Sequence, residues 1–111
     1  MRTIIAGSRD FTVYGILKQA MEGFEKPTVV LSGNARGADQ LGERWARENN
    51  IRIERYIPNW HLGRGAGFAR NVQMAQNAER LIAFWDGNSR GTKHMIDTAR
   101  AYDLIVEVVR V

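Results

Sequence analysis

The amino-acid sequence predicts an α/β protein, a three-layer α/β/α sandwich in which helices cover both faces of a five-stranded parallel sheet. Two observations predict this fold class. Apolar, strand-like segments alternate with helix-like segments along the whole chain, which is typical of βαβ units. The chain's 111 residues suffice for one hydrophobic core but not for two, so residues 1–111 are expected to form a single domain.

The first elements are a buried strand, a helix and a second buried strand. Residues 2–6 and 28–31 are short, continuous apolar runs, which is typical of strands covered on both faces. Between them a helix is expected to begin after Thr12, which can act as its N-cap, because apolar residues then recur at helical spacing. Pro27 ends this unit, and the second helix covers residues 38–50.

The second helix has two distinct faces and leads into an alternating segment. Leu41 and Trp45 share one face, while Glu43 and Arg47 are spaced for an i,i+4 ion pair on another. Residues 51–56 alternate between apolar and polar side chains, which is typical of a half-exposed strand.

The second half of the chain repeats this pattern after a long loop at residues 58–65. Residues 81–85 form a continuous apolar strand, and charged residues interrupt the apolar ones in the last strand, residues 104–111. The apolar positions that define the third and fourth helices are Phe68, Val72 and Ala75, and Met95, Ile96, Ala99 and Tyr102.

The composition of the strands predicts their order in the sheet. The strands at residues 2–6, 28–31 and 81–85 are apolar throughout and belong inside, whereas those at 51–56 and 104–111 carry charges and belong at the edges. The order 3-2-1-4-5 meets this requirement, whereas 2-1-3-4-5 would bury a charged strand. Ligands in such sheets bind where the strand order reverses, here between the first and fourth strands.

Composition and charge favour an anionic partner. The chain has no cysteine, and no segment approaches the ~20 apolar residues of a membrane span, so we expect a cytoplasmic protein with no membrane contact. A net charge of +4 and a pI near 10 fit a nucleic acid or an anionic small ligand. The absence of a basic run or tail argues against a disordered nucleic-acid-binding arm. Nucleic acid is the less favoured partner, because few aromatic residues beyond Trp60 are expected to be exposed. His61 and His94 lack carboxylates at ligand spacing, so neither a metal nor a cofactor is expected.

Glycine-rich loops are expected to gather at one edge of the sheet, because each follows a parallel strand. Residues 32–39 combine two glycines, an arginine and the start of a helix, whose free N–H groups favour a phosphate. Similar loops lie at residues 7–11, 63–67 and 86–92, and the opposite edge has none. The residues predicted to bind the ligand are Gly7, Ser8, Arg9, Gly33, Arg36, Gly37, Asp39, Arg70, Asp86, Gly87, Ser89, Arg90, Gly91 and Thr92.

Several of these positions leave two interpretations open. Ser8 suits either a phosphate contact or a turn, and Asp39 suits either a ribose hydroxyl or the positive end of a helix. Asp86 fits a hydroxyl acceptor or an Asp-Gly turn, and Thr92 can cap the fourth helix while presenting its N–H to a phosphate. Trp60 fits a base-stacking platform or an apolar plug under the long loop.

The loop motifs resemble the YspA-type branch of the SLOG superfamily, and the resemblance covers nearly the whole chain. This superfamily includes the Lonely Guy phosphoribohydrolases and the DNA-processing protein DprA. The resemblance implies a Rossmann-like fold and a nucleotide or nucleotide-derived ligand. The motifs that carry it are residues 7–11 (Gly-Ser-Arg-Asp-Phe), 32–39 (Ser-Gly-Asn-Ala-Arg-Gly-Ala-Asp), 70–71 (Arg-Asn) and 83–93 (Ala-Phe-Trp-Asp-Gly-Asn-Ser-Arg-Gly-Thr-Lys).

The resemblance also bears on catalysis. In the phosphoribohydrolases, an arginine on the third helix acts with a glutamate that follows the fourth strand. Arg70 is similar to that arginine and is the candidate catalytic residue, but the glutamate position is Met95 here. A thioether cannot transfer a proton or stabilise a cationic sugar. In this chain, Asp39 or Asp86 would have to supply the carboxylate.

We therefore expect a protein that binds a nucleoside monophosphate or an ADP-ribose-like molecule as a sensor, carrier or sequestering protein. The alternative hypothesis is an N-glycosidase that acts on such a nucleotide. A third is single-stranded DNA binding in the manner of DprA. The resemblance also implies a homodimer or a higher homo-oligomer, with Trp45 and Phe68 as candidate interface residues.

Overall fold

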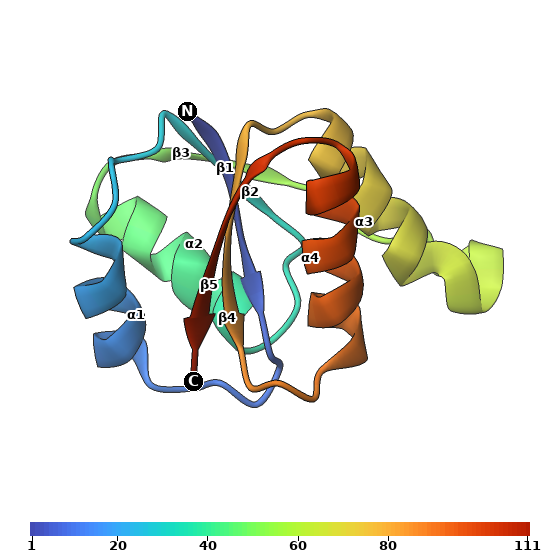
Figure 1. Ribbon diagram of the computed structural model, residues 1–111, viewed down its shortest axis with the longest axis horizontal. Coiled ribbons are helices and arrows are strands. Elements are labelled where there is room, and N and C mark those ends of the chain that lie inside the picture. The colour runs from blue at the N-terminus through green and yellow to red at the C-terminus, as the bar shows by residue number, and fades with distance from the viewer.

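The computed structural model describes all 111 residues and contains a five-stranded parallel sheet of order β3-β2-β1-β4-β5 (Figure 1). The predicted order 3-2-1-4-5 is therefore confirmed. The strands are β1 (Arg2–Gly7), β2 (Val29–Ser32), β3 (Arg52–Arg55), β4 (Arg80–Trp85) and β5 (Ile105–Arg110). All four neighbouring pairs are parallel, so the loops that follow the strands lie at one edge of the sheet.

Helices cover both faces of the sheet, as the three-layer prediction requires. Figure 1 shows α1 and α2 on one side of the sheet and α3 and α4 on the other. The short 3-10 helix η1 precedes α3 and extends beyond the main body. The helices are α1 (Tyr14–Met21), α2 (Ala38–Glu48), η1 (Trp60–Gly65), α3 (Ala66–Gln76) and α4 (Arg90–Ala101).

The core has two halves, one on each face of the central strands. Because successive strand residues point to opposite faces, Ile4 packs beneath α3 and α4 while Ile5 packs beneath α1 and α2. In β4, Leu81 and Ile82 divide in the same way. These residues are fully buried, whereas no residue of β3 or β5 is. This agrees with the prediction that apolar strands lie inside the sheet and charged strands at its edges.

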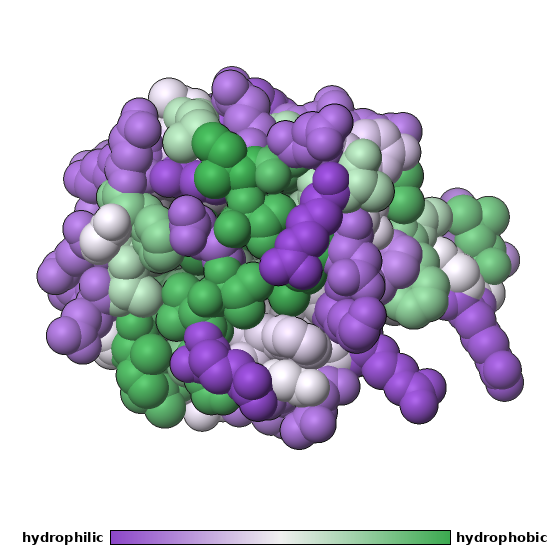
Figure 2. Space-filling model, viewed as in Figure 1, coloured by the Kyte–Doolittle hydropathy of each residue, from purple (hydrophilic) through white to green (hydrophobic).

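The edge strand β5 presents apolar as well as charged side chains to solvent. Figure 2 views the molecule with β5 in front and shows apolar surface across this edge. Ile105 and Val108 are 49% and 40% exposed, and Glu107 and Arg110 lie on the same strand. No helix has the length and apolar content that a membrane crossing requires.

The first helix differs from its prediction at both ends. Val13, not Thr12, occupies the N-cap position and makes no side-chain capping bond, and the helix ends at Met21. Its first residue, Tyr14, donates a 2.6 Å hydrogen bond to Glu48 and stacks under the guanidinium of Arg44. These contacts with α2 fix the start of α1, and no capping residue is involved.

The helical spacing does not predict burial at two other apolar positions. Phe68 was expected on one face with Val72 and Ala75, but it is 47% exposed, and the residues buried after it in α3 are Asn71, Met74 and Ala75. Tyr102 is 44% exposed at the C-cap of α4. Residues 60–65 form η1, whereas a loop was predicted there.

Glu43 forms the predicted i,i+4 ion pair with Arg47, at 3.8 Å, but it is buried and has closer partners that the sequence did not indicate. Its side chain is 4% exposed and accepts a 2.7 Å hydrogen bond from the Ser32 hydroxyl and a 2.9 Å bond from Arg55 Nε. Glu43 therefore connects α2 to the ends of β2 and β3 through hydrogen bonds. On the same helix, Trp45 is 4% exposed and belongs to the core, so it cannot form a subunit interface.

Replacing Glu43 tests whether this buried carboxylate stabilises the fold. We expect Glu43→Ala to lower the free energy of unfolding by about 2–3 kcal/mol, because the Ser32 hydroxyl loses its buried acceptor. The control is Gln40→Ala, which removes an exposed side chain of the same helix and should cause a much smaller loss. Urea unfolding followed by tryptophan fluorescence measures both, and equal losses would contradict the structural role of Glu43.

Candidate functional site

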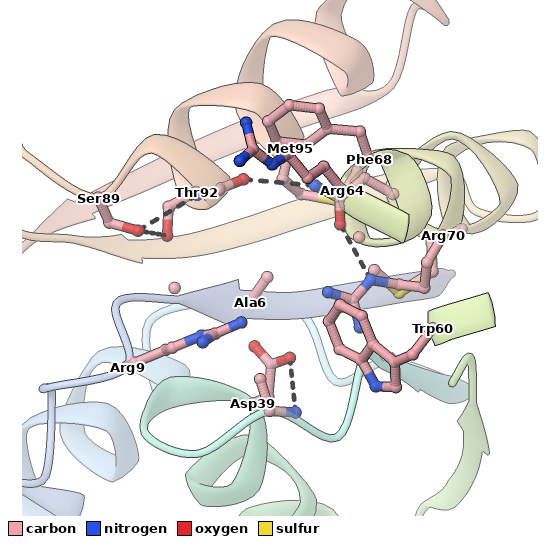
Figure 3. Close-up of a pocket in the computed structure, with 16 residues that line it drawn as sticks. Ala6, Arg9, Asp39, Trp60, Arg64, Phe68, Arg70, Ser89, Thr92 and Met95 are labelled. Atoms are coloured by element: carbon pink, nitrogen blue, oxygen red, sulfur yellow. Dashed lines mark hydrogen bonds between the residues drawn. The ribbon is translucent and has the colours of Figure 1, made fainter. Parts of the chain in front are cut away.

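Two adjoining hollows lie at the edge of the sheet where the strands end. We call them the inner hollow, of about 220 Å³, and the outer hollow, of about 450 Å³. Figure 3 shows the inner hollow, with Arg9 and Asp39 approaching the end of β1 from one side and Ser89, Thr92 and Arg64 from the other. It lies beside the end of β1, where the strand order reverses. Its lining residues are Ala6, Gly7, Arg9, Ala35, Asp39, Trp60, Arg64, Gly67, Phe68, Arg70, Asn71, Met74, Ser89, Gly91, Thr92 and Met95.

Ser8 joins the loops that surround the inner hollow, but it does not line the hollow. It is 2% exposed; its N–H donates to Phe84 O at 2.9 Å, and its hydroxyl accepts from the N–H of Asp86 at 3.1 Å. Its carbonyl accepts from the N–H groups of Phe11 and Ala38, each at 3.2 Å. Each polar group of Ser8 therefore has a partner within the protein, which corresponds to the turn interpretation.

The start of α2 is closely packed against the loop after β1. Gly37 has φ = 81°, and a Cβ there would collide with the carbonyl oxygens of Ser8 and Arg9. The N–H of Ala38 donates to Ser8, so this N–H is not free for an anion as the sequence suggested. Arg36 is 73% exposed and has an exposed partner, Asp10, at 3.5 Å.

Asp39 places a buried carboxylate in the wall of the inner hollow. It is 5% exposed, and its Oδ2 accepts a hydrogen bond from the N–H of Ala35 at 3.2 Å. Burial raises the pKa of Asp39 to about 6, although the N–H groups of Ala35 and Gly7 and the charge of Arg70 act in the opposite direction. The carboxylate is therefore ionised at neutral pH and titrates within the physiological range.

Arg70 supplies a half-buried guanidinium from the first turns of α3. Nη1 donates to Gly33 O at 2.8 Å, and a Cβ at position 33 would collide with the guanidinium. The glycine therefore makes room for Arg70. Burial lowers the pKa of Arg70 and Asp39 raises it, but an arginine remains protonated at neutral pH. Asp39 and Arg70 form no direct ion pair, so both are available to a third group between them.

Asn71 orients Arg70 and links α3 to the start of α4. Its Oδ1 accepts from Arg70 Nε at 3.1 Å, and its Nδ2 lies 3.3 Å from Gly91 O and 3.1 Å from His94 Nδ1. Burial lowers the pKa of His94, so the imidazole is neutral and can accept this hydrogen bond. Its ring stacks on Phe68 with 4.1 Å between centroids. Asn71, which is 5% exposed, was not among the predicted site residues.

The loop after β4 uses its acidic residue for its own structure. Asp86 Oδ1 accepts from the N–H groups of Asn88 and Ser89, both at 2.8 Å, and these bonds lower the pKa of Asp86. Ser89, not Thr92, caps α4, with its hydroxyl accepting from the N–H of Thr92 at 3.3 Å. Gly91 and Thr92 line the hollow beside Ser89.

The structure brings together about half of the predicted residues in the inner hollow. Gly33 and Arg36 line the outer hollow, which shares Arg9, Ala35, Trp60 and Arg70 with the inner one. For the predicted residues that line neither hollow, direct ligand contact stays a prediction. The predicted residues in the inner hollow are Gly7, Arg9, Asp39, Arg70, Ser89, Gly91 and Thr92, and those in neither are Ser8, Gly37, Asp86, Gly87 and Arg90.

Arg64 and Asn71 line the inner hollow but were not among the predicted ligand-binding residues, and Phe68, which also lines it, was expected at a subunit interface. Arg64 lies in a glycine-rich segment that was predicted, which was a usable signal, and Asn71 lies next to Arg70 in a motif that carried the resemblance. Trp60, left open between two interpretations, is 64% exposed and lines both hollows, so it is not an apolar plug.

Comparisons with known proteins place this architecture in a family. The Gene 61 protein of Mycobacterium phage D29 is 34% identical over 110 residues, covering 89% of this chain and 88% of that protein. The solved structure of DNA processing protein A (DprA) from Streptococcus pneumoniae matches 99% of this chain with a TM-score of 0.82 at 18% identity. This chain spans 50% of that DprA chain, and the likeness shows the shared fold.

The family profile described as "YspA, cpYpsA-related SLOG family" matches residues 1–63, more than half of the chain. This segment includes the loop after β1, the loop between β2 and α2, and Asp39. Two of the four motifs that suggested the resemblance, residues 7–11 and 32–39, lie within the matched region. This chain belongs to the YspA, cpYpsA-related SLOG family.

Proposed function

We propose that the chain binds a nucleotide or nucleotide-derived phosphorylated ligand in the inner hollow and acts as a sensor, carrier or sequestering protein. The observation that carries this proposal is the presence of Asp39 and Arg70 in the wall of one hollow without a direct ion pair. A buried carboxylate and a half-buried guanidinium that form no ion pair with each other suit a ligand that has both hydroxyl and phosphate groups. Membership of the SLOG family supports a nucleotide-related role in general.

The proposed contacts follow from the chemistry of each side chain. The ionised Asp39 accepts hydrogen bonds from sugar hydroxyls, because a carboxylate has acceptors and no donors. The phosphate lies among Arg9, Arg64 and Arg70. The guanidinium groups of Arg9 and Arg64 can each donate two parallel hydrogen bonds. Arg70 instead donates from Nη2, because its Nε and Nη1 bond to Asn71 and Gly33. The exposed ring of Trp60 provides a stacking surface for the base.

Hydrolysis of the N-glycosidic bond is the second candidate function, and one observation favours it. Asp39 is the carboxylate in the wall of the inner hollow, whereas Asp86 is bonded to its own loop. Met95, at the position of the phosphoribohydrolase glutamate, is 1% exposed and packs in the core. Asp39 would therefore have to stabilise the cationic sugar alone, which favours binding over cleavage.

Single-stranded DNA binding is the third candidate, supported by the fold that this chain shares with DprA. Binding of this kind depends on phosphate contacts, and it weakens steeply as salt is added. A homo-oligomer also stays a proposal, with the exposed Phe68 as its candidate contact residue.

We predict that Arg70→Gln weakens the binding of a nucleoside monophosphate by about tenfold or more, because one charge-assisted contact with the phosphate is lost. Isothermal titration calorimetry against a panel of nucleoside monophosphates measures the affinity. The matched control is Arg100→Ala, which removes one exposed charge from the last turn of α4. Because Arg70 also bonds Gly33, circular dichroism must show that the variant is folded. No binding of any nucleotide to the unaltered protein would refute the proposal.

The raised pKa of Asp39 predicts a pH dependence of ligand binding. Hydroxyl donation from a ribose favours the ionised carboxylate, so affinity should rise as the pH increases through about 6, and binding should release a proton. The second ionisation of a phosphate monoester also falls near pH 6, so the wild-type profile alone is insufficient.

The variant Asp39→Asn separates these two contributions. It keeps an oxygen acceptor for the N–H of Ala35 but cannot ionise. We expect the affinity of this variant to keep the pH dependence that comes from ionisation of the phosphate and to lose the part that comes from ionisation of Asp39. Calorimetry from about pH 5 to about pH 7.5 in buffers of different ionisation enthalpy gives the proton release directly. Identical profiles for both proteins would contradict the contact between Asp39 and the sugar.

The preference for binding over cleavage makes a further prediction. Nucleoside monophosphates incubated with the protein for many hours should be recovered intact by liquid chromatography, because Met95 offers no carboxylate opposite Asp39. Release of free base by the wild type but not by Asp39→Asn would instead establish the N-glycosidase.

A further inference from the structure

The outer hollow continues the inner one past Arg70 and Trp60. The two hollows share one wall, made of Arg9, Ala35, Trp60 and Arg70. The residues found only in the outer hollow come from the loop after β2 and from the segment after β3. They are Gly33, Asn34, Arg36, Ile57 and Pro58.

The outer hollow differs from the inner one in charge. Three arginines line it, Arg9, Arg36 and Arg70, and no acidic side chain does. Arg9 and Arg70 take part in no ion pair. The pair of Arg36 with Asp10 joins side chains that are 73% and 91% exposed, and pairs in that setting contribute little stability. This hollow is therefore suited to an anion rather than to sugar hydroxyls.

The volumes show that the inner hollow alone is small for the ligand. Sites for small molecules and cofactors enclose about 300–1,000 Å³. The inner hollow, at about 220 Å³, falls below this range, whereas both hollows together lie within it. A ligand that extends past Arg70 into the outer hollow therefore occupies a site of ordinary size.

We propose that the outer hollow binds a second phosphoryl group of the same ligand, so that the natural ligand carries at least two phosphoryl groups. This proposal rests on the proposed function of the inner hollow. Arg70 and Arg9 stand between the two groups and contact both, while Arg36 contacts the second group only. The exposed ring of Trp60 lies along the path between them and supports the connecting part of the ligand.

The test compares ligands with one and two phosphoryl groups. The probes are adenosine monophosphate, adenosine diphosphate and the 5′-phosphorylated dinucleotide pApA, each titrated by calorimetry at one fixed salt concentration. We expect at least one of the two-phosphate ligands to bind about tenfold more tightly than the monophosphate, because it adds a charge-assisted contact. An advantage for the diphosphate identifies a pyrophosphate-linked ligand, and an advantage for pApA identifies a phosphodiester-linked one.

Arg36→Ala is the variant that isolates the outer hollow. Arg36 is exposed and lines only that hollow, so the substitution should leave the fold and monophosphate affinity unchanged. We expect it to remove most of the two-phosphate advantage, and Arg36→Lys to restore part of it. Arg64→Ala, which alters only the inner hollow, should weaken all three ligands to a similar extent. Arg100→Ala should change none of them.

The outcomes separate this proposal from the proposed function. If the monophosphate binds but neither two-phosphate ligand binds more tightly, the outer hollow holds no second phosphoryl group and the proposed function stands. The same holds if Arg36→Ala weakens all three ligands equally, because the residue then acts through general charge. If none of the ligands binds, the proposed function itself fails.

Discussion

The arrangement of the site depends on the hydrogen bonds of one small buried residue, Ser8. Its N–H, carbonyl and hydroxyl bond to the end of β4, the start of α2 and the loop before α4, respectively. These segments lie up to 78 residues apart in the chain. Because buried polar groups need partners, the loops can be packed together only where all of these bonds form at once. Ser8 thereby fixes the relative positions of α2 and α4, and with them the two sides of the inner hollow.

This junction has a chemical consequence for the site. The N–H of Ala38 is used to hold α2 against Ser8, and Gly37 is required for that close approach. The start of α2 therefore contributes less to anion binding than its sequence suggests. The positive charge comes instead from the side chains of Arg9, Arg64 and Arg70, which come from different segments of the chain. In this protein, backbone hydrogen bonds between the loops fix the shape of the hollow, and arginine side chains provide its positive charge.

Arg70 shows how the two sides of the hollow are connected. Its guanidinium extends from α3 to the loop after β2, where it bonds Gly33, and the neighbouring Asn71, itself bonded to the start of α4, accepts from its Nε. A guanidinium that is fixed in this way has lost much of its side-chain freedom before a ligand arrives, so binding costs less conformational entropy. Opposite it, Asp39 is a buried carboxylate with a raised pKa, while Met95 leaves no second carboxylate. One fixed cation opposite one acid supports the proposal that the hollow holds a ligand without cleaving it.

The sequence alone determined the fold class, the strand order and the edge of the sheet where the hollows lie. Those features follow from local patterns: continuous apolar runs for the central strands, charged residues in β3 and β5, and glycine-rich loops after the strands. Only the tertiary structure decided which loop residues line a hollow. Ser8 and Asp86 are of residue types that often contact ligands, yet their side chains form hydrogen bonds within the protein. Asn71 and Glu43 acquire their roles from partners 20 and 11 residues away, respectively. A residue's hydrogen-bond partners depend on the distances between segments after folding, and local sequence patterns do not contain those distances.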